Sequence, residues 1–276
     1  MARIVKSKFA ELTKHIFLWA IMFFTFLPLY LMLNISLKDN QQFARNPWLP
    51  EAPFHWHNFI VGWSHIGDKI FNTTFIAFTT TFLAIGIAVL GAFFFARYKL
   101  PGSKILFFIF LLLMMYPGVV NMVPTFKLIC SLRLYNTHMA LIVTGIATAQ
   151  AFTIYVLRNF IEEIPEDLFE AIEIDGGNVF HQIWHIVIPM SLPIIGTLSV
   201  LRIIAIWNNF VGPLLYLRDS KLQVIAVSLL HLEGEYTKNW GELMAGYTIA
   251  SIPLIIIFIF CMRLFVRGLS TGAIKG

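Results

Sequence analysis

Charged residues are scarce in this sequence. Only 13% of its 276 residues are Asp, Glu, Lys or Arg, while 58% are hydrophobic, and the mean hydropathy is +0.76. A soluble domain typically carries about a quarter charged residues, because water must solvate its surface. This chain has too few for that and must be solvated largely by lipid. We therefore expect a single membrane domain over residues 1–276.

Metal-binding and catalytic patterns are also missing. The only two cysteines are far apart in the chain, and no H-E-x-x-H sequence occurs. His55 and His57 can hold a metal in principle but are more simply loop residues. His181 and His185 stand one helical turn apart without a third ligand nearby, so we interpret them as interface residues. We expect no metal site and no catalytic residues.

Six apolar stretches reach the roughly 20 residues that a membrane-spanning helix needs. The predicted spans are residues 16–35, 71–96, 105–126, 138–157, 190–217 and 243–265. Pro117 and Pro124 in the third span should kink or end a helix. Lys and Arg cluster before the first span, between the second and third, and after the last. The positive-inside rule therefore places both termini in the cytoplasm.

The connection after the fourth span is unusually acidic. Residues 162–175 hold seven of the fifteen carboxylates of the chain and no Lys or Arg. Pro165 suits the first turn of a helix, and the acids after it favour the positive end of the helix dipole. Leu168, Phe169 and Ile172 form an apolar stripe at helical spacing. This pattern predicts a short amphipathic helix.

A glycine pair follows this helix. Gly176 and Gly177 should end it, because glycine accepts the left-handed conformation of a helix cap. A second short helix is predicted over residues 179–186, with Pro189 ending it. Its apolar stripe comprises Phe180, Ile183, Trp184 and Val187. The resulting hairpin, residues 163–189, is either an amphipathic loop that joins two spans or a docking element.

The residue identities favour a docking element. The run from Glu170 to Pro189 reads E-A-I, three residues, G, nine residues, I-x-I-P. It resembles the cytoplasmic signature of binding-protein-dependent ABC importer permeases, E-A-A, three residues, G, nine residues, I-x-L-P. Ile172 and Ile188 replace Ala and Leu of that pattern. The residues that the resemblance implies for ATPase coupling are Glu170, Ala171, Ile172, Asp175, Gly176, Gly177, Phe180, Ile186 and Pro189.

The C-terminal tail, residues 266–276, carries a second resemblance. The sequence from Gly268 to the end is similar to the tail of the carbohydrate subgroup, the maltose-type permeases. The resemblance implies that Gly272, Ala273 and Lys275 contact the ATPase. On composition alone, a disordered polar end is the alternative.

The resemblance implies an all-α type I ABC importer permease of a bacterial or archaeal inner membrane, with six spans and a coupling hairpin between spans four and five. Its implied partners are a second similar permease, two ATP-binding subunits and an extracytoplasmic solute-binding protein that contacts residues 218–242. The chain has no G-x-x-x-x-G-K-[ST] loop, so ATP and Mg²⁺ would be bound by the partner ATPase and not by this transport subunit. A carbohydrate substrate is implied by the resemblance alone.

The predicted spans contain no Asp or Glu. Ion-coupled secondary transporters usually need intramembrane carboxylates or broken polar helices, so this absence argues against the competing hypothesis, an ion-coupled transporter or channel. Arg202 is the only charge deep in a span, where insertion scales give a cost of about 2.5–3.5 kcal/mol. It either pairs within the bundle or reaches the headgroups, or else it faces the pore or a partner permease. Candidates for a pore or partner contact are Arg202, Trp207, Asn208 and Asn209.

Overall fold

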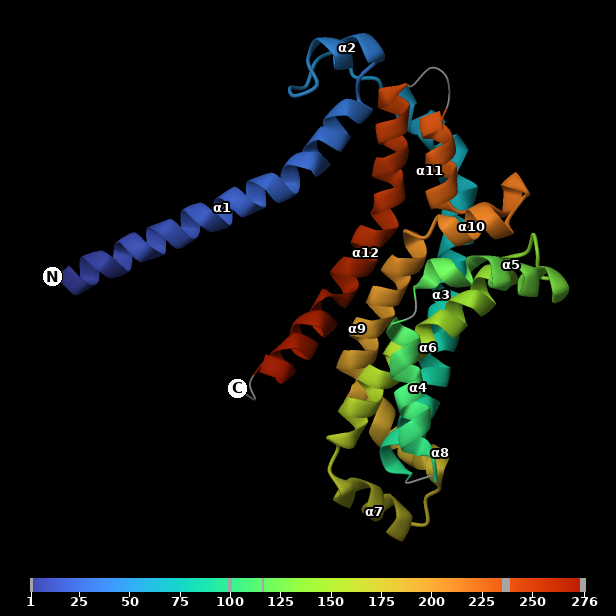
Figure 1. The fold of residues 1–276 in the computed structure, drawn as a ribbon. Helices are drawn as coiled ribbons and strands as arrows, with labels where there is room; N and C mark the ends of the chain where they lie inside the picture. The colour runs from blue at the N-terminus through green and yellow to red at the C-terminus, as the bar shows by residue number, and fades with distance from the viewer. Residues whose placement is uncertain (1, 99–100, 116, 235–238, 274–276) are drawn as a thin grey trace. The chain divides into compact units, whose positions relative to one another are not determined.

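The computed structural model describes residues 2–98, 101–115, 117–234 and 239–273, which form helices and connections without a strand (Figure 1). Two compact units divide the chain. The first combines Met1–Gly67 with Leu229–Ile252, and the second combines Asp68–Ser228 with Pro253–Gly276.

Five helical segments of the described residues are long and apolar enough to cross a membrane, and the number is six if a bent pair of helices forms one span. This confirms the predicted all-α fold class. The segments are α1 (Ala2–Ser36), α3 (His57–Arg97), α4 (Ser103–Met115) with η1 (Gly118–Asn121) and α5 (Met122–Ser131), α6 (His138–Glu162), α8 to α9 (Val179–Trp207), and α12 (Trp240–Ala273).

The boundaries differ from the prediction in two broken spans. The third is not one straight helix, because α4 and the segment from Gly118 to Ser131 are bent by 95°. Pro117, extended at ψ 120°, caps η1 at this break, since proline has no N–H to continue a helix. The fifth ends at Trp207, and a separate short helix, α10 (Val211–Tyr216), follows.

Other segments are also more helical than the sequence indicated. The second span begins as α3 at His57, before the predicted start at residue 71. The last span continues as α12 to Ala273, past the predicted end at residue 265. Residues 218–242, expected to be an external loop, contain η3 (Ser220–Leu222) and α11 (Ile225–Gly234). Most residues of α11 are apolar, and Ile225, Val227 and Leu229 are buried, so this segment is packed and not an open loop.

In the first unit, a buried lysine organises the connection between α1 and α2 (Asn40–Arg45). Lys38 is only 1% exposed and donates hydrogen bonds to the backbone carbonyls of Asn46 and Leu49. This burial lowers the pKa of the Lys38 ammonium, and the nearby Glu51 carboxylate partly offsets the effect. The lysine thus replaces the water that the two carbonyls would otherwise bind.

In the second unit, α3, α6 and α9 (Ile188–Trp207) share one apolar core, which includes Phe93, Leu157 and Leu198. A second cluster joins α3, α5, α6 and α10 around Ile76 and Tyr216. Within this unit, α7 and α8 lie at one end of the α6–α9 bundle, and α5 and α10 lie toward the other (Figure 1). The two ends hold the two candidate sites.

Candidate functional site

The hairpin is anchored by its first helix, α7 (Glu166–Ile174), to the end of α3. Phe169 is 2% exposed, and its ring lies 6.4 Å from the ring of Phe93. The guanidinium of Arg97 stacks 4.0 Å from the Phe169 ring centroid, while its Nη2 lies 3.4 Å from Glu166 Oε1. One buried aromatic ring and one arginine therefore fix α7 to the membrane helices.

The glycine pair ends α7 as predicted. Gly176 has a φ of +78°, and its N–H donates to the Glu173 carbonyl at 3.0 Å. The N–H of Gly177 donates to the Ile172 carbonyl at 2.8 Å. These two bonds form a Schellman motif, with Gly176 in the left-handed position that glycine occupies without strain.

The two glycines nevertheless have different surroundings. A Cβ atom on Gly176 would have no heavy atom within 4 Å, whereas one on Gly177 would collide with the side chain of Ile172 and lie 2.9 Å from its carbonyl oxygen. Gly177 is therefore required for packing inside the hairpin. At Gly176, the outer surface of the turn is open, so another protein surface can approach it closely.

The second half of the hairpin departs from the prediction. Asn178 caps α8 (Val179–Gln182) through a bond from the His181 N–H, and Pro189 does not end the helix. Helix continues through a π-helical turn, η2 (Ile183–Val187), into α9. A proline ring normally clashes with the carbonyl four residues earlier, and the wider π turn relieves that contact.

The predicted apolar stripe of this second half divides into two faces. Ile183 and Val187 are buried in the core of the second unit. Phe180 and Trp184 are 75% and 70% exposed, and Ile174 at the end of α7 is 86% exposed. Within the described chain, these three large apolar side chains are uncovered on an element that is otherwise rigidly anchored.

The predicted coupling residues mostly lie on this uncovered side. Gln182 Nε2 donates to Glu173 Oε1 at 2.8 Å and ties the two helices of the hairpin together. Exposed positions are Glu170, Ala171, Asp175, Gly176, Phe180 and Pro189; half-buried ones are Ile172 and Gly177; Ile186 is buried. Ile186 therefore supports the hairpin from within.

Of the predicted tail contacts, Gly272 and Ala273 lie in the final turn of α12, and Lys275 lies outside the described residues.

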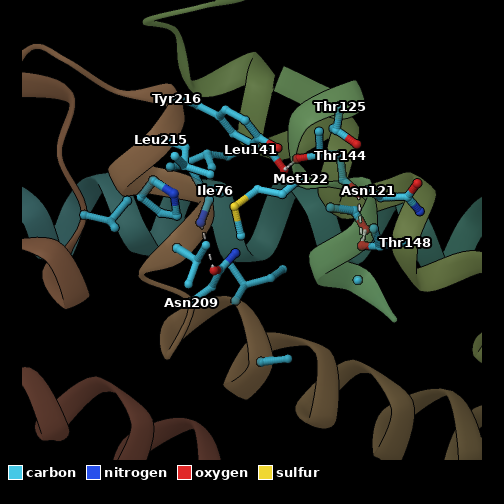
Figure 2. Close-up of a pocket in the computed structure, with 18 of the residues that line it drawn as sticks. Ile76, Asn121, Met122, Thr125, Leu141, Thr144, Thr148, Asn209, Leu215 and Tyr216 are labelled. Atoms are coloured by element: carbon cyan, nitrogen blue, oxygen red, sulfur yellow. Dashed lines mark hydrogen bonds between the residues drawn. The ribbon is translucent and has the colours of Figure 1, made fainter. Parts of the chain in front are cut away.

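A second site is a pocket of about 550 Å³ at the opposite end of the second unit. Figure 2 shows Met122 of α5 and Asn209 of the α9–α10 connection facing each other across it. Its lining residues with polar side chains are Thr73, Asn121, Thr125, Thr144, Thr148, Arg202, Asn209 and Tyr216. Its volume falls within the ~300–1,000 Å³ range of small-molecule sites.

Of the four predicted pore or partner contacts, the structure brings two into this pocket. Arg202 and Asn209 line it. Trp207 is 4% exposed and outside the lining, so it is a core residue. Asn208 caps the end of α9, its Nδ2 donating to the Ile204 carbonyl at 3.0 Å.

The sequence prediction missed the threonines of α6. Thr144 and Thr148 are one turn apart in a span, and both line the pocket. Each hydroxyl also donates to the carbonyl four residues before it, at 2.7 and 3.0 Å. The hydroxyl proton is therefore satisfied within α6, which lets the side chain lie in an apolar span. The i, i+4 spacing of two hydroxyls in an apolar span was the available signal.

Arg202 reaches this site because Gly145 lets it approach α6. Its Nη2 donates to the Gly145 carbonyl and, at 3.2 Å, to Thr148 Oγ1. A Cβ at position 145 would lie 2.6 Å from Thr80 Cγ2 and 3.4 Å from Arg202 Nη2. The glycine thus creates the space in which three helices meet.

Replacement of Gly145 by alanine is expected to destabilise the protein by about 1–3 kcal/mol, since overpacking exceeds the gain of about 1 kcal/mol from helix propensity. Adding Thr80→Ser, which deletes the colliding methyl group, should recover much of this loss. Thermal unfolding in detergent measures both effects. Gly86→Ala in α3, where no atom lies within 4 Å, is the matched control and should not destabilise. An equal loss at both glycines would contradict the packing explanation.

The bundle, the anchored hairpin with an uncovered face and the intramembrane pocket together define a membrane-embedded transport subunit. The family model described as binding-protein-dependent transport system inner membrane component matches residues 84–271. The chain belongs to this family.

Named relatives match over most of the chain. The probable ABC transporter permease YurM of Bacillus subtilis is 31% identical, covering 90% of this chain and 83% of the relative. The melibiose/raffinose/stachyose import permease MelC of the same organism is 30% identical, covering 91% and 92%. In fold, the chain is similar to a bacterial ABC transporter involved in alginate import, with a TM-score of 0.83 at 18% identity over 94% of this chain and 98% of the other.

Proposed function

We propose that this chain is one of two pore-forming permease subunits of an ATP-driven carbohydrate importer. Support comes from the relatives MelC and AraQ, which are named for melibiose/raffinose/stachyose and for arabinooligosaccharides. A second similar permease would complete the pore, and two ATP-binding subunits would bind ATP and Mg²⁺. An external solute-binding protein would deliver the sugar. A transporter neighbour in complex with an alginate pentasaccharide-bound periplasmic protein, at a TM-score of 0.61, is consistent with that delivery.

The hairpin carries the proposal. Its base is fixed to α3 through Phe169, while Ile174, Phe180 and Trp184 are uncovered beside a row of carboxylates. A soluble partner with an apolar cleft and basic rim fits such a surface, because charge complementarity guides the encounter and apolar burial holds it.

An anchored hairpin can also transmit motion. When ATP closes the partner subunits, a hairpin seated in them moves as a rigid body and carries α6 and α9 with it. The proposal includes an inner-membrane location with the hairpin and both termini in the cytoplasm, and the positive-inside charge pattern supports this orientation. The C-terminal residues Gly272, Ala273 and Lys275 would then reach the same ATPase.

Reconstitution tests this function directly. Proteoliposomes that contain both permeases and the ATP-binding subunits should accumulate radiolabelled oligosaccharide only when ATP and the binding protein are supplied. Omission of the ATP-binding subunits should reduce uptake to the level of empty liposomes. Uptake driven by a proton or sodium gradient in their absence would instead establish the competing ion-coupled mechanism.

A further inference from the structure

The pocket contains a cation for which the described residues offer no counter-charge. Arg202 is half-buried within a span, and the ion pairs among the described residues do not include it. Its Nη2 donates only to neutral oxygens, those of Gly145 and Thr148. Its buried Nε has no acceptor in the described part of the chain. The guanidinium therefore has one buried donor without a partner, and no carboxylate among the described residues neutralises its charge.

The surroundings of this cation are suited to a polyhydroxylated molecule. Hydroxyl and amide groups of Thr144, Thr148 and Asn209 share the pocket with apolar side chains such as Met122 and Ile206. The two threonine hydroxyls donate within α6, but their oxygens can still accept hydrogen bonds from sugar hydroxyls. The Asn209 amide both donates and accepts hydrogen bonds, and apolar side chains cover the C–H faces of a sugar ring. Neutral groups alone can orient such a ligand, but they leave the charge of Arg202 uncompensated.

We propose that this pocket binds an anionic carbohydrate during transport, with Arg202 pairing the carboxylate of a uronic acid or the phosphate of a sugar phosphate. This inference rests on the proposed carbohydrate importer and names its substrate class. The planar guanidinium binds either anion through charge-assisted hydrogen bonds. The Gly145 carbonyl and Thr148 hydroxyl hold one edge of the guanidinium, which orients the rest.

Equilibrium dialysis on the complete importer in lipid nanodiscs tests the assignment without the binding protein. The radiolabelled probes are digalacturonate, glucose 6-phosphate and neutral lactose. We expect at least one acidic probe to bind roughly tenfold more tightly than lactose, the effect of one charge-assisted contact. Preference for digalacturonate or for the phosphate identifies the anion.

Variants connect this preference to Arg202. Arg202→Gln should weaken the acidic probe roughly tenfold and leave lactose unchanged, while Arg202→Lys should retain a preference for the acid. Lys127→Gln removes an exposed cation of α5 that does not line the pocket, and it should change nothing.

Three results would overturn the proposal. These are binding of no probe, equal affinity for lactose and the acids, or dissociation of the two permease chains by Arg202→Gln, which would assign the counter-charge to the partner subunit. ATP-dependent uptake of neutral oligosaccharide through the same complex would preserve the importer function while rejecting the anionic substrate. The two claims can therefore fail separately.

Discussion

Replacement of Gly176 by tryptophan is expected to abolish ATP-driven transport and association with the ATP-binding subunits, while the protein still inserts into the membrane. Gly176 has a φ of +78°, so any other residue meets a conformational cost of about 1–2 kcal/mol. That cost alone leaves the fold intact. The larger effect arises outside the chain, because an indole on the exposed turn keeps a partner surface from approaching.

Co-purification of the ATP-binding subunits with the tagged permease and uptake in proteoliposomes measure this effect. Gly102→Trp is a matched control, since Gly102 has a φ of +82° and equally open surroundings but lies in the connection before α4. The control should insert, associate and transport. If both variants lose association equally, the backbone strain and not the hairpin surface is responsible, and the coupling role of Gly176 is wrong.

Truncation of Phe169 to alanine should release the hairpin from the membrane helices. The ring is almost fully buried against Phe93 and Arg97, and removal of a buried phenylalanine typically costs about 3–5 kcal/mol. Loss of the cation–π contact adds about 1 kcal/mol. We expect lower thermal stability and a rise in ATP hydrolysed per sugar transported, because a loosened hairpin follows its partner without moving α6 and α9.

Leu168→Ala is the control for this variant. Leu168 is the preceding residue of α7, but it is 41% exposed, so its truncation creates no cavity. It should change stability by less than about 0.5 kcal/mol and leave the coupling ratio unchanged. Equal behaviour of the two variants would mean that Phe169 does not anchor the hairpin.

The ends of α7 could be predicted because their causes are local. Pro165 excludes an N–H at the start, and Gly176 supplies the left-handed residue at the stop, both within one helical turn. The continuation through Pro189 could not be predicted in this way. It depends on the π turn η2, whose buried side chains Ile183 and Val187 pack in the core of the second unit.

The two faces of α8 and η2 also could not be predicted from the local sequence pattern. Phe180, Ile183, Trp184 and Val187 satisfy one helical stripe in the sequence, and periodicity treats them alike. Packing separates them, because Ile183 and Val187 contact the bundle while Phe180 and Trp184 do not. Exposure of these two aromatic residues is what makes the hairpin a candidate docking surface.

By itself, the sequence determined the membrane environment, the helical fold class and the hairpin with its glycine stop, since these follow from composition, run length and local backbone chemistry. Tertiary structure alone decided how Arg202 is used. The sequence places one charge in an apolar span. It leaves open whether this charge pairs within the bundle, reaches the headgroups, or faces the pore or a partner permease. The absence of a side chain at Gly145 lets α6, α9 and Thr80 of α3 meet closely, so the guanidinium lines the pocket together with polar and apolar side chains. Contacts between residues 57 positions apart cannot be read from periodicity, because they arise only once the helices pack.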